Sequence, residues 1–227
     1  MSPVGRLARD INLRDVAGLR VEGGGVVASG RLYRSGHLDH LRLSERQALL
    51  EELGVTDIVD LRHRTGCHDG VTVTRHTHPL VPLGTKPVVD PADTYESVAD
   101  WYLRQLTIGT ESLRRIVELV ATSDGATLIH CHAGKDRTGS VVAVILSAVG
   151  VTREDVVADY ARTGTVEGDA FLDALPPKFA ESHPDTMSHL LDKIERKFGS
   201  GLGFIEAIGV EGGVIRKLRE RLVREGD

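Results

Sequence analysis

Short runs of aliphatic and β-branched residues recur along the first part of the chain, and glycine or polar residues bound each run. Runs of this kind predict β-strands. The expected strands lie at residues 26–29, 32–34, 55–62, 71–83 and 126–130.

Other segments place apolar residues three and four positions apart, a spacing that predicts helices. The expected helices lie at residues 43–53, 94–107, 110–122 and 138–150, and from Thr152 onward the whole chain is predicted to be helical. Ser44 is followed three residues later by Gln47, a capping-box pattern that predicts Ser44 as the N-cap of a helix ending at Gly54.

Strands that alternate with helices and then give way to a helical tail predict an α/β fold. We expect a mostly parallel central sheet flanked by helices and followed by a helical C-terminal part. The 227 residues contain neither an internal repeat nor a low-complexity linker, so residues 1–227 are predicted to form a single domain.

Composition narrows the classes of partner. The net charge of -5 and the 4% aromatic content argue against a nucleic-acid binder, which needs a basic surface and often stacking rings. No apolar run reaches membrane-spanning length, and the N-terminal residues lack the apolar core of a signal peptide. The two cysteines, Cys67 and Cys131, are typical of reduced thiols. We therefore expect a cytoplasmic monomer that is not inserted in a membrane.

The most informative stretch is "LIHCHAGKDRTGSVVAVIL", residues 128–146, where a strand runs into a polar loop and then an apolar helix. Ligands of open α/β sheets bind at such a junction. Backbone N–H groups of the loop and the helix N-terminus form an anion cradle, and Ala133 and Gly134 allow close approach of a ligand. The same positive field would stabilise the thiolate of Cys131.

Arg137 follows Cys131 by six residues, and its planar guanidinium suits bidentate contact with a phosphate. A thiolate beside an anion cradle and an arginine is suited to attack on phosphorus. The product of that attack is a phosphocysteine, which water then hydrolyses.

The string "HCHAGKDRTG" resembles the signature loop of the cysteine-dependent protein tyrosine and dual-specificity phosphatases. It is most similar to a bacterial branch that acts on phosphotyrosine, phosphoserine/threonine and phosphoinositides. The segments "NLRDVAGL", "GRLYRSGHLDHL", "GVTDIVDLR" and "FGSGLGFIEAIGVEGGVIRKLRERL" resemble the same branch in order and spacing, so the resemblance covers roughly residues 10–224. It implies a phosphatase-type fold without metal or cofactor and a phosphorylated protein or phosphoinositide as the substrate.

The resemblance also implies roles for single residues. Cys131 matches the nucleophile, Arg137 the phosphate-binding arginine, and Thr138 the hydroxyl that assists breakdown of the intermediate. His130 matches the residue that orders the loop and supports the thiolate, and Asp136 matches a proposed general acid. The expected phosphate-binding residues are His132, Ala133, Gly134, Lys135, Asp136 and Arg137. One departure is Gly66, which stands where the branch usually has a glutamate.

Several assignments stay open. Asp90 and Asp93 compete with Asp136 for the role of general acid. The segment at residues 164–190 forms either a lid or ordinary packing. The residues that either line the pocket or form buried ion pairs are Arg14, Asp15, Arg34 and Arg62. A catalytically silent phosphate-binding module is the alternative function.

A group of histidines and a cysteine lies at His63, Cys67, His68, His76 and His78. Their spacing matches no standard zinc pattern, so we predict no metal site. Cys67 is either an ordinary free thiol or a partner that shields Cys131 in a reversible disulfide.

Overall fold

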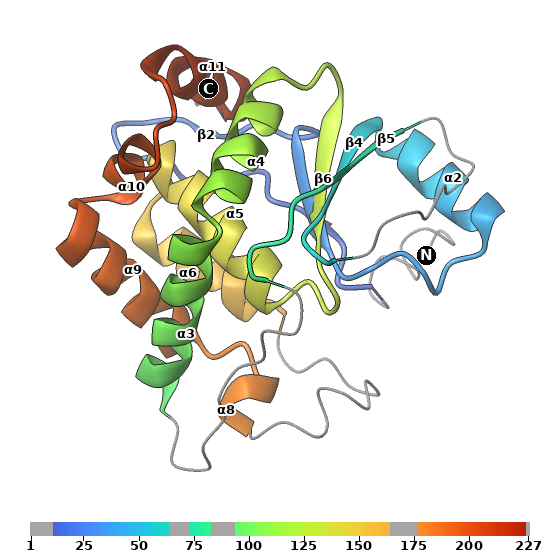
Figure 1. The fold of residues 1–227 in the computed structure, drawn as a ribbon. Helices are drawn as coiled ribbons and strands as arrows, with labels where there is room; N and C mark the ends of the chain where they lie inside the picture. The colour runs from blue at the N-terminus through green and yellow to red at the C-terminus, as the bar shows by residue number, and fades with distance from the viewer. Residues whose placement is uncertain (1–10, 64–72, 83–93, 164–176, 226–227) are drawn as a thin grey trace.

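A computed structural model describes residues 11–63, 73–82, 94–163 and 177–225 (Figure 1). Its strands are β1 (Arg14–Asp15), β2 (Val26–Val27), β3 (Leu32–Ser35), β4 (Val55–Asp60), β5 (Thr74–Thr77), β6 (Ala126–His130) and β7 (Val223–Arg224). Five of them form a sheet in the order β1-β3-β6-β4-β5, and β2 pairs with β7 separately. Strands β3, β6, β4 and β5 run parallel, while β1 is antiparallel to β3. The predicted mostly parallel α/β sheet is confirmed.

The helices are α2 (Leu43–Glu52), α3 (Tyr95–Ile108), α4 (Thr110–Thr122), α5 (Asp136–Ala148), α6 (Arg153–Ala161), α8 (Pro177–Ala180), α9 (Pro184–Phe198), α10 (Gly201–Ala207) and α11 (Gly212–Leu222). The helices expected at residues 94–107 and 110–122 are confirmed as α3 and α4. Helix α5 begins two residues earlier than the apolar run suggested, so the turn after β6 is short.

Two predictions about local structure are wrong. The N-cap of α2 is Arg42 and not Ser44, because the carboxylate of Glu45 accepts the backbone N–H of Arg42 at 2.9 Å and the helix starts two residues earlier. The region after Thr152 is not wholly helical, because Val223–Arg224 forms β7 against β2. A strand of two residues is too short to leave a periodic pattern.

Side chains of the central strands alternate between two apolar layers, as the period of a strand requires. In β6, Leu128 packs in a small core that includes Leu49 and Leu50 of α2, whereas Ile129 packs in the larger core beneath α5. In β4, Ile58 and Val59 divide in the same way. Figure 1 accordingly shows α2 on one side of the sheet and most other helices on the opposite side.

Helix α5 is the centre of the larger layer. Its residues from Thr138 to Leu146 are all buried, and it packs against α3, α6 and α10. The continuous apolar run in the sequence thus reflects burial on every side of the helix. This packing fixes the position of its N-terminus at the end of β6.

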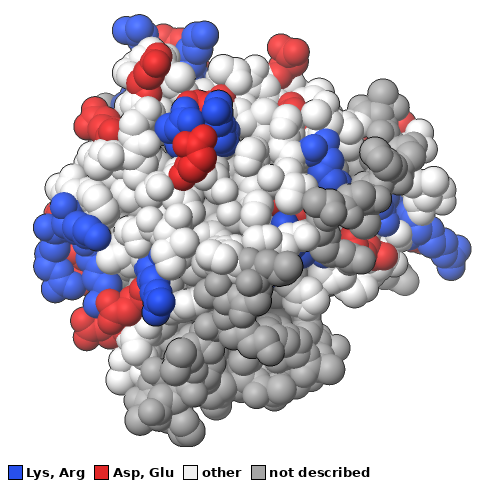
Figure 2. Space-filling view, in the orientation of Figure 1, with Lys and Arg blue, Asp and Glu red and all other residues white. Residues whose placement is uncertain are grey.

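Charged side chains of both signs lie on the face seen in Figure 2, some at its edges and others grouped in its upper middle part. Among the described helices, none is both long enough and apolar enough to cross a membrane.

Candidate active site

The chain brings Cys131 to the carboxyl end of the central strand β6, between the ends of β3 and β4. Only four residues separate Cys131 from the first residue of α5, Asp136. The Cys131 side chain belongs to the larger apolar core and is 2% exposed. The predicted strand–loop–helix setting is therefore confirmed, and the thiol lies where the loop meets the apolar core.

The carbonyl groups of the loop are held from outside. The carbonyl of His132 accepts the backbone N–H of His37 at 2.9 Å, and the Asn12 side chain donates to the carbonyls of Ala133 and Gly134 at 3.2 and 3.3 Å. A guanidinium nitrogen of Arg34 donates to the same Gly134 carbonyl at 2.9 Å. Sequence patterns alone did not point to Asn12, whose left-handed φ of 55° is the one non-glycine case in the described chain.

Fixing these carbonyls orients the N–H groups of the loop, because N–H and C=O point in opposite directions across a trans peptide. The N–H groups of Ala133, Gly134 and Lys135 therefore turn toward the inside of the loop. No acceptor for them occurs within the described chain. Three inward donors at a helix N-terminus form an anion cradle.

Glycine at position 134 is required by both conformation and space. Gly134 has a φ of +70°, and an added Cβ would lie 2.4 Å from the Ser35 carbonyl carbon and 2.5 Å from the Gly36 nitrogen. The loop is thus pressed against the turn that follows β3. This contact was not predicted from the sequence, where glycine was assigned only to ligand approach.

Arg137 and Thr138 lie in the first turn of α5. A guanidinium nitrogen of Arg137 donates to the carbonyl of Leu61 at 3.3 Å, and within the described chain no carboxylate lies at ion-pair distance from it. The Thr138 side chain is fully buried, and its hydroxyl has no hydrogen-bond partner among the described residues. Both side chains retain donors for a ligand bound near Cys131.

His130 is fully buried directly behind Cys131. One ring nitrogen lies 3.2 Å from the Cys131 carbonyl, and the other lies 3.6 Å from a carboxylate oxygen of Asp60. Burial lowers the pKa of His130 to about 4, although the nearby Asp60 opposes this shift. The imidazole is therefore neutral at neutral pH and acts on the loop as a hydrogen-bonding group.

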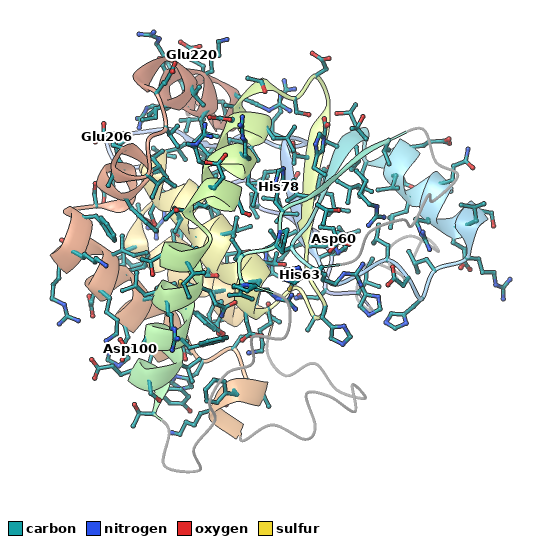
Figure 3. All side chains as sticks on the ribbon, in the orientation of Figure 1. Asp60, His63, His78, Asp100, Glu206 and Glu220 are labelled. Carbon is teal, nitrogen blue, oxygen red and sulfur yellow. The ribbon has the colours of Figure 1, made fainter. Side chains whose placement is uncertain are left out.

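Asp60 connects His130 to a buried ionic network, and sequence analysis did not identify it as a site residue. Its carboxylate accepts from Arg62 at 2.8 and 2.9 Å and from Arg75 at 3.2 Å. Burial alone would raise the pKa of Asp60, but the hydrogen bonds from Arg62 and the neighbouring His130 lower it below its ordinary value. Arg62 also pairs with Asp39 at 2.9 Å. Figure 3 labels Asp60 among the side chains at the end of the central strands.

A second network holds the opposite side of the loop. Asp159 of α6 pairs with Arg34 at 2.5 Å and with Arg14 at 2.8 Å; the side chains of Asp159 and Arg34 are buried, and that of Arg14 is 9% exposed. Burial alone would raise the pKa of Asp159, but the two arginines lower it below its ordinary value. Of the open alternatives, buried ion pairing thus describes Arg14, Arg34 and Arg62, while Asp15 accepts hydrogen bonds from the turns at Ala17 and Gly30.

Asp136 lies at the N-terminus of α5 with 30% of its side chain exposed. One of its oxygens, Oδ1, accepts from the hydroxyl of Tyr102 and from the ammonium of Lys135, the latter at 2.5 Å. Lys135 has no exposed side-chain surface. Burial alone would lower the pKa of Lys135, but the adjacent Asp136 raises it, so the amine is charged. The sequence did not predict the contribution of Tyr102, which lies 34 positions earlier.

Three histidine rings meet beside the loop. The ring centroid of His37 lies 4.1 Å from that of His40 and 4.8 Å from that of His132. Burial and the neighbouring His40 lower the pKa of His37 to about 4. Because His37 lies in the turn after β3, its contact with His132 packs the His132 ring against that turn.

The proposed histidine group is only partly described. His76 pairs with Asp57 at 2.9 Å and its ring stacks over that of His78 at 6.3 Å. Within the described ranges, no three or more potential ligands are grouped to hold a metal ion. The positions that lie outside the described residues are Gly66, Cys67, His68, Asp90 and Asp93.

The segment proposed as a lid is also partly described. Residues 164–176 lie outside the described chain, whereas α9 packs against α3 and α6. Met187 and Leu190 of α9 are fully buried. The described part of this segment therefore contributes to the core.

A model of the tyrosine phosphatase family matches residues 6–224. The chain belongs to the tyrosine phosphatase family. It is 34% identical over 190 residues to the triple specificity protein phosphatase PtpB of Mycobacterium tuberculosis, an alignment that covers 67% of this chain and 66% of that protein. It is 26% identical over 149 residues to a tyrosine-protein phosphatase of Nostoc commune, covering 58% of this chain and 51% of the relative. The alignments thus leave a third or more of each relative unmatched.

The solved structures that the chain is similar to are more distant in sequence. The core catalytic domain of the PP-IP phosphatase SIW14 from S. cerevisiae is 18% identical, with a TM-score of 0.43 over 78% of this chain and 91% of that chain. P. aeruginosa TpbA is 20% identical, with a TM-score of 0.34 over 70% and 84% of the two chains. Membership of the family rests on the sequence match.

Proposed function

We propose that this chain is a phosphoric monoester hydrolase that works through a phosphocysteine intermediate. The observation that carries the proposal is the convergence of the Cys131 thiol, three inward backbone N–H groups and the Arg137 guanidinium at one strand end. Family membership supports it, because the matched region includes every one of these residues.

In the first step, the Cys131 sulfur attacks phosphorus as a thiolate and the bond to the ester oxygen breaks. The loop N–H groups and Arg137 stabilise the charge on the transferring phosphoryl oxygens, since preorganised donors act most strongly where charge develops. The leaving oxygen takes a proton from a general acid. We assign that role to Asp136, with Asp90 and Asp93 as the alternatives.

In the second step, water attacks phosphorus and the thiolate of Cys131 leaves. The buried hydroxyl of Thr138, which has no other partner in the described chain, is available to the sulfur as a hydrogen-bond donor. The neutral His130 holds the backbone of Cys131 in place. Release of inorganic phosphate completes the cycle without a metal or cofactor.

The substrate class we propose is phosphotyrosine together with other phosphate monoesters, including phosphoinositides. The relative named as a triple specificity phosphatase supports a broad range. A monomeric, cytoplasmic protein formed from one domain over residues 1–227 remains our prediction from composition. The catalytically silent phosphate-binding module becomes an outcome of the test below.

The test is hydrolysis of p-nitrophenyl phosphate in the presence of a metal chelator. Cys131→Ser should abolish turnover while retaining the binding of phosphate analogues such as tungstate, because the amide cradle remains. Arg137→Lys should lose most of the activity, since an ammonium cannot make the bidentate contact. Substantial turnover by Cys131→Ser contradicts the mechanism, and vanadate binding without turnover by the unmodified chain identifies the silent module.

A further inference from the structure

Tyr102 reaches the catalytic loop from the middle of α3 and has no assigned role. Its side chain is fully buried, and its ring packs in the larger core with the ring of Tyr160 at a centroid distance of 6.2 Å. Its hydroxyl donates to Oδ1 of Asp136 and lies 2.8 Å from the hydroxyl of Tyr160. A buried hydroxyl placed on a partly exposed carboxylate is a specific feature of this site.

The proton order in this chain of groups can be assigned. Burial and the neighbouring Asp136 raise the pKa of Tyr102 well above its ordinary value, so its hydroxyl stays protonated. A carboxylate oxygen accepts and does not donate, so the Tyr102 proton points to Asp136. The Tyr160 hydroxyl, whose pKa burial also raises, then donates to the Tyr102 oxygen. The sequence of donors runs from Tyr160 through Tyr102 to Asp136.

Both protein donors to Asp136 use the same oxygen. Oδ1 receives the Tyr102 hydroxyl and the Lys135 ammonium, whereas Oδ2 has no partner among the described residues. With one oxygen fixed from two sides, the rotation of the carboxyl group is restricted. The second oxygen is left to carry and deliver a proton.

We propose that Tyr102 is a positioning residue that fixes Asp136 for proton transfer to the leaving group. This inference rests on the proposed function. As the sulfur–phosphorus bond forms, the phosphorus–ester oxygen bond breaks, its electron pair stays on the ester oxygen, and that oxygen takes the proton from Oδ2. The resulting carboxylate keeps its hydrogen bonds from Tyr102 and Lys135. Water returns the proton when it attacks the phosphocysteine.

The experiment compares Tyr102→Phe with Tyr160→Phe as a matched control. Each change removes one buried hydroxyl and keeps the ring, but only the first removes a donor to Asp136. The substrates are a phosphoserine peptide, whose alkoxide needs a proton, and p-nitrophenyl phosphate, whose phenolate leaves without help. Tyr102→Phe should lower kcat/KM for phosphoserine about 10-fold more than for p-nitrophenyl phosphate, in keeping with loss of one hydrogen bond to a charged group. Tyr160→Phe should change both by less than about 2-fold.

A double-variant comparison separates positioning from general damage. In an Asp136→Asn background, Tyr102→Phe should add no further dependence on the leaving group. Vanadate inhibition should be unchanged in Tyr102→Phe, because the cradle is not altered. If Tyr102→Phe does not fold, Lys135→Gln replaces the charged donor to Oδ1 with a shorter neutral amide and should show the same leaving-group dependence.

Equal losses on the two substrates for Tyr102→Phe, or for Lys135→Gln in its place, would overturn the positioning role. If turnover depends on Cys131 but Tyr102→Phe lowers kcat/KM equally for the two substrates, this inference fails and the proposed function still stands. Absence of any Cys131-dependent turnover in the unmodified chain would overturn both.

Discussion

Burial of His130 predicts a specific acid sensitivity of the fold. The pKa of His130 is lowered to about 4 in the folded chain, chiefly by burial, whereas an unfolded histidine titrates near about 6.5. Between these values the unfolded state binds more protons, so the free energy of unfolding rises with pH. The contribution is complete above the unfolded pKa and is lost as the pH falls toward the folded pKa.

The expected size follows from the two pKa values. Between pH 7 and pH 5, His130 alone should account for a loss of about 2 kcal/mol in the free energy of unfolding. Carboxylates remain largely ionised over this range, so they add little. His37, whose pKa is also lowered to about 4, adds a loss of its own. The effect of His130 is therefore measured as a difference between variants.

The perturbation is His130→Asn, which removes the titrating ring and keeps an N–H donor for the Cys131 carbonyl. Urea unfolding at pH 7, 6 and 5 should show a smaller loss of stability on acidification than in the unmodified chain, by about 2 kcal/mol. Ile129→Val, a buried neighbour without a proton to titrate, is the control. It should lower stability by about 1 kcal/mol at every pH. A pH dependence in His130→Asn parallel to that of Ile129→Val would refute the argument.

Three further predictions follow from the contacts of the site. Asp60→Asn removes the buried negative charge that pairs with Arg62 and Arg75, and it should destabilise the fold by about 3 kcal/mol in urea unfolding. A loss below about 1 kcal/mol would contradict this. Gly134→Ala places a Cβ against the backbone of the turn after β3, so it should abolish vanadate binding. Normal vanadate binding would show that the turn moves to accommodate the added carbon. Lys135→Ala should impair hydrolysis of a phosphoinositide more than of phosphotyrosine, because the buried ammonium donates to Asp136 and an inositol alkoxide needs a proton more than a phenolate does. Equal losses in kcat/KM on the two substrates would contradict this.

The sequence predicted the parts of the site that are continuous along the chain. Residues 130–138 carry the proposed nucleophile, the cradle and the proposed phosphate-binding arginine in one string, and the apolar runs on both sides identify the strand and the helix. The central strands β4 and β6 were also predictable, because their buried positions carry aliphatic residues such as Ile58, Val59 and Ile129. Two-residue strands such as β1 and β7 leave no such pattern.

The parts that could not be predicted depend on long-range contacts. Asn12 meets the loop across 121 positions, and Asp159 meets Arg34 across 125. A lone asparagine or aspartate has no local signal that separates a buried ion pair from an exposed charge. Tyr102 reads as one more apolar residue of α3, since only its hydroxyl reaches Asp136. Periodicity predicts which face of an element is buried, but it does not predict which polar atoms meet there.

The two buried networks act on different parts of the loop, and this separation predicts how the site responds to damage. Asp159 orients Arg34, which holds the Gly134 carbonyl outward and so keeps the adjacent N–H turned inward. Asp60 instead faces His130, which holds the backbone of the nucleophile. Loss of Asp159 should therefore weaken phosphate-analogue binding first, whereas loss of Asp60 should act first on the reactivity of Cys131. A cradle preorganised in this way has little reorganisation to undergo when charge develops on the phosphoryl group. The buried charges next to the loop thus fix the orientations of the peptide groups on which the proposed chemistry depends.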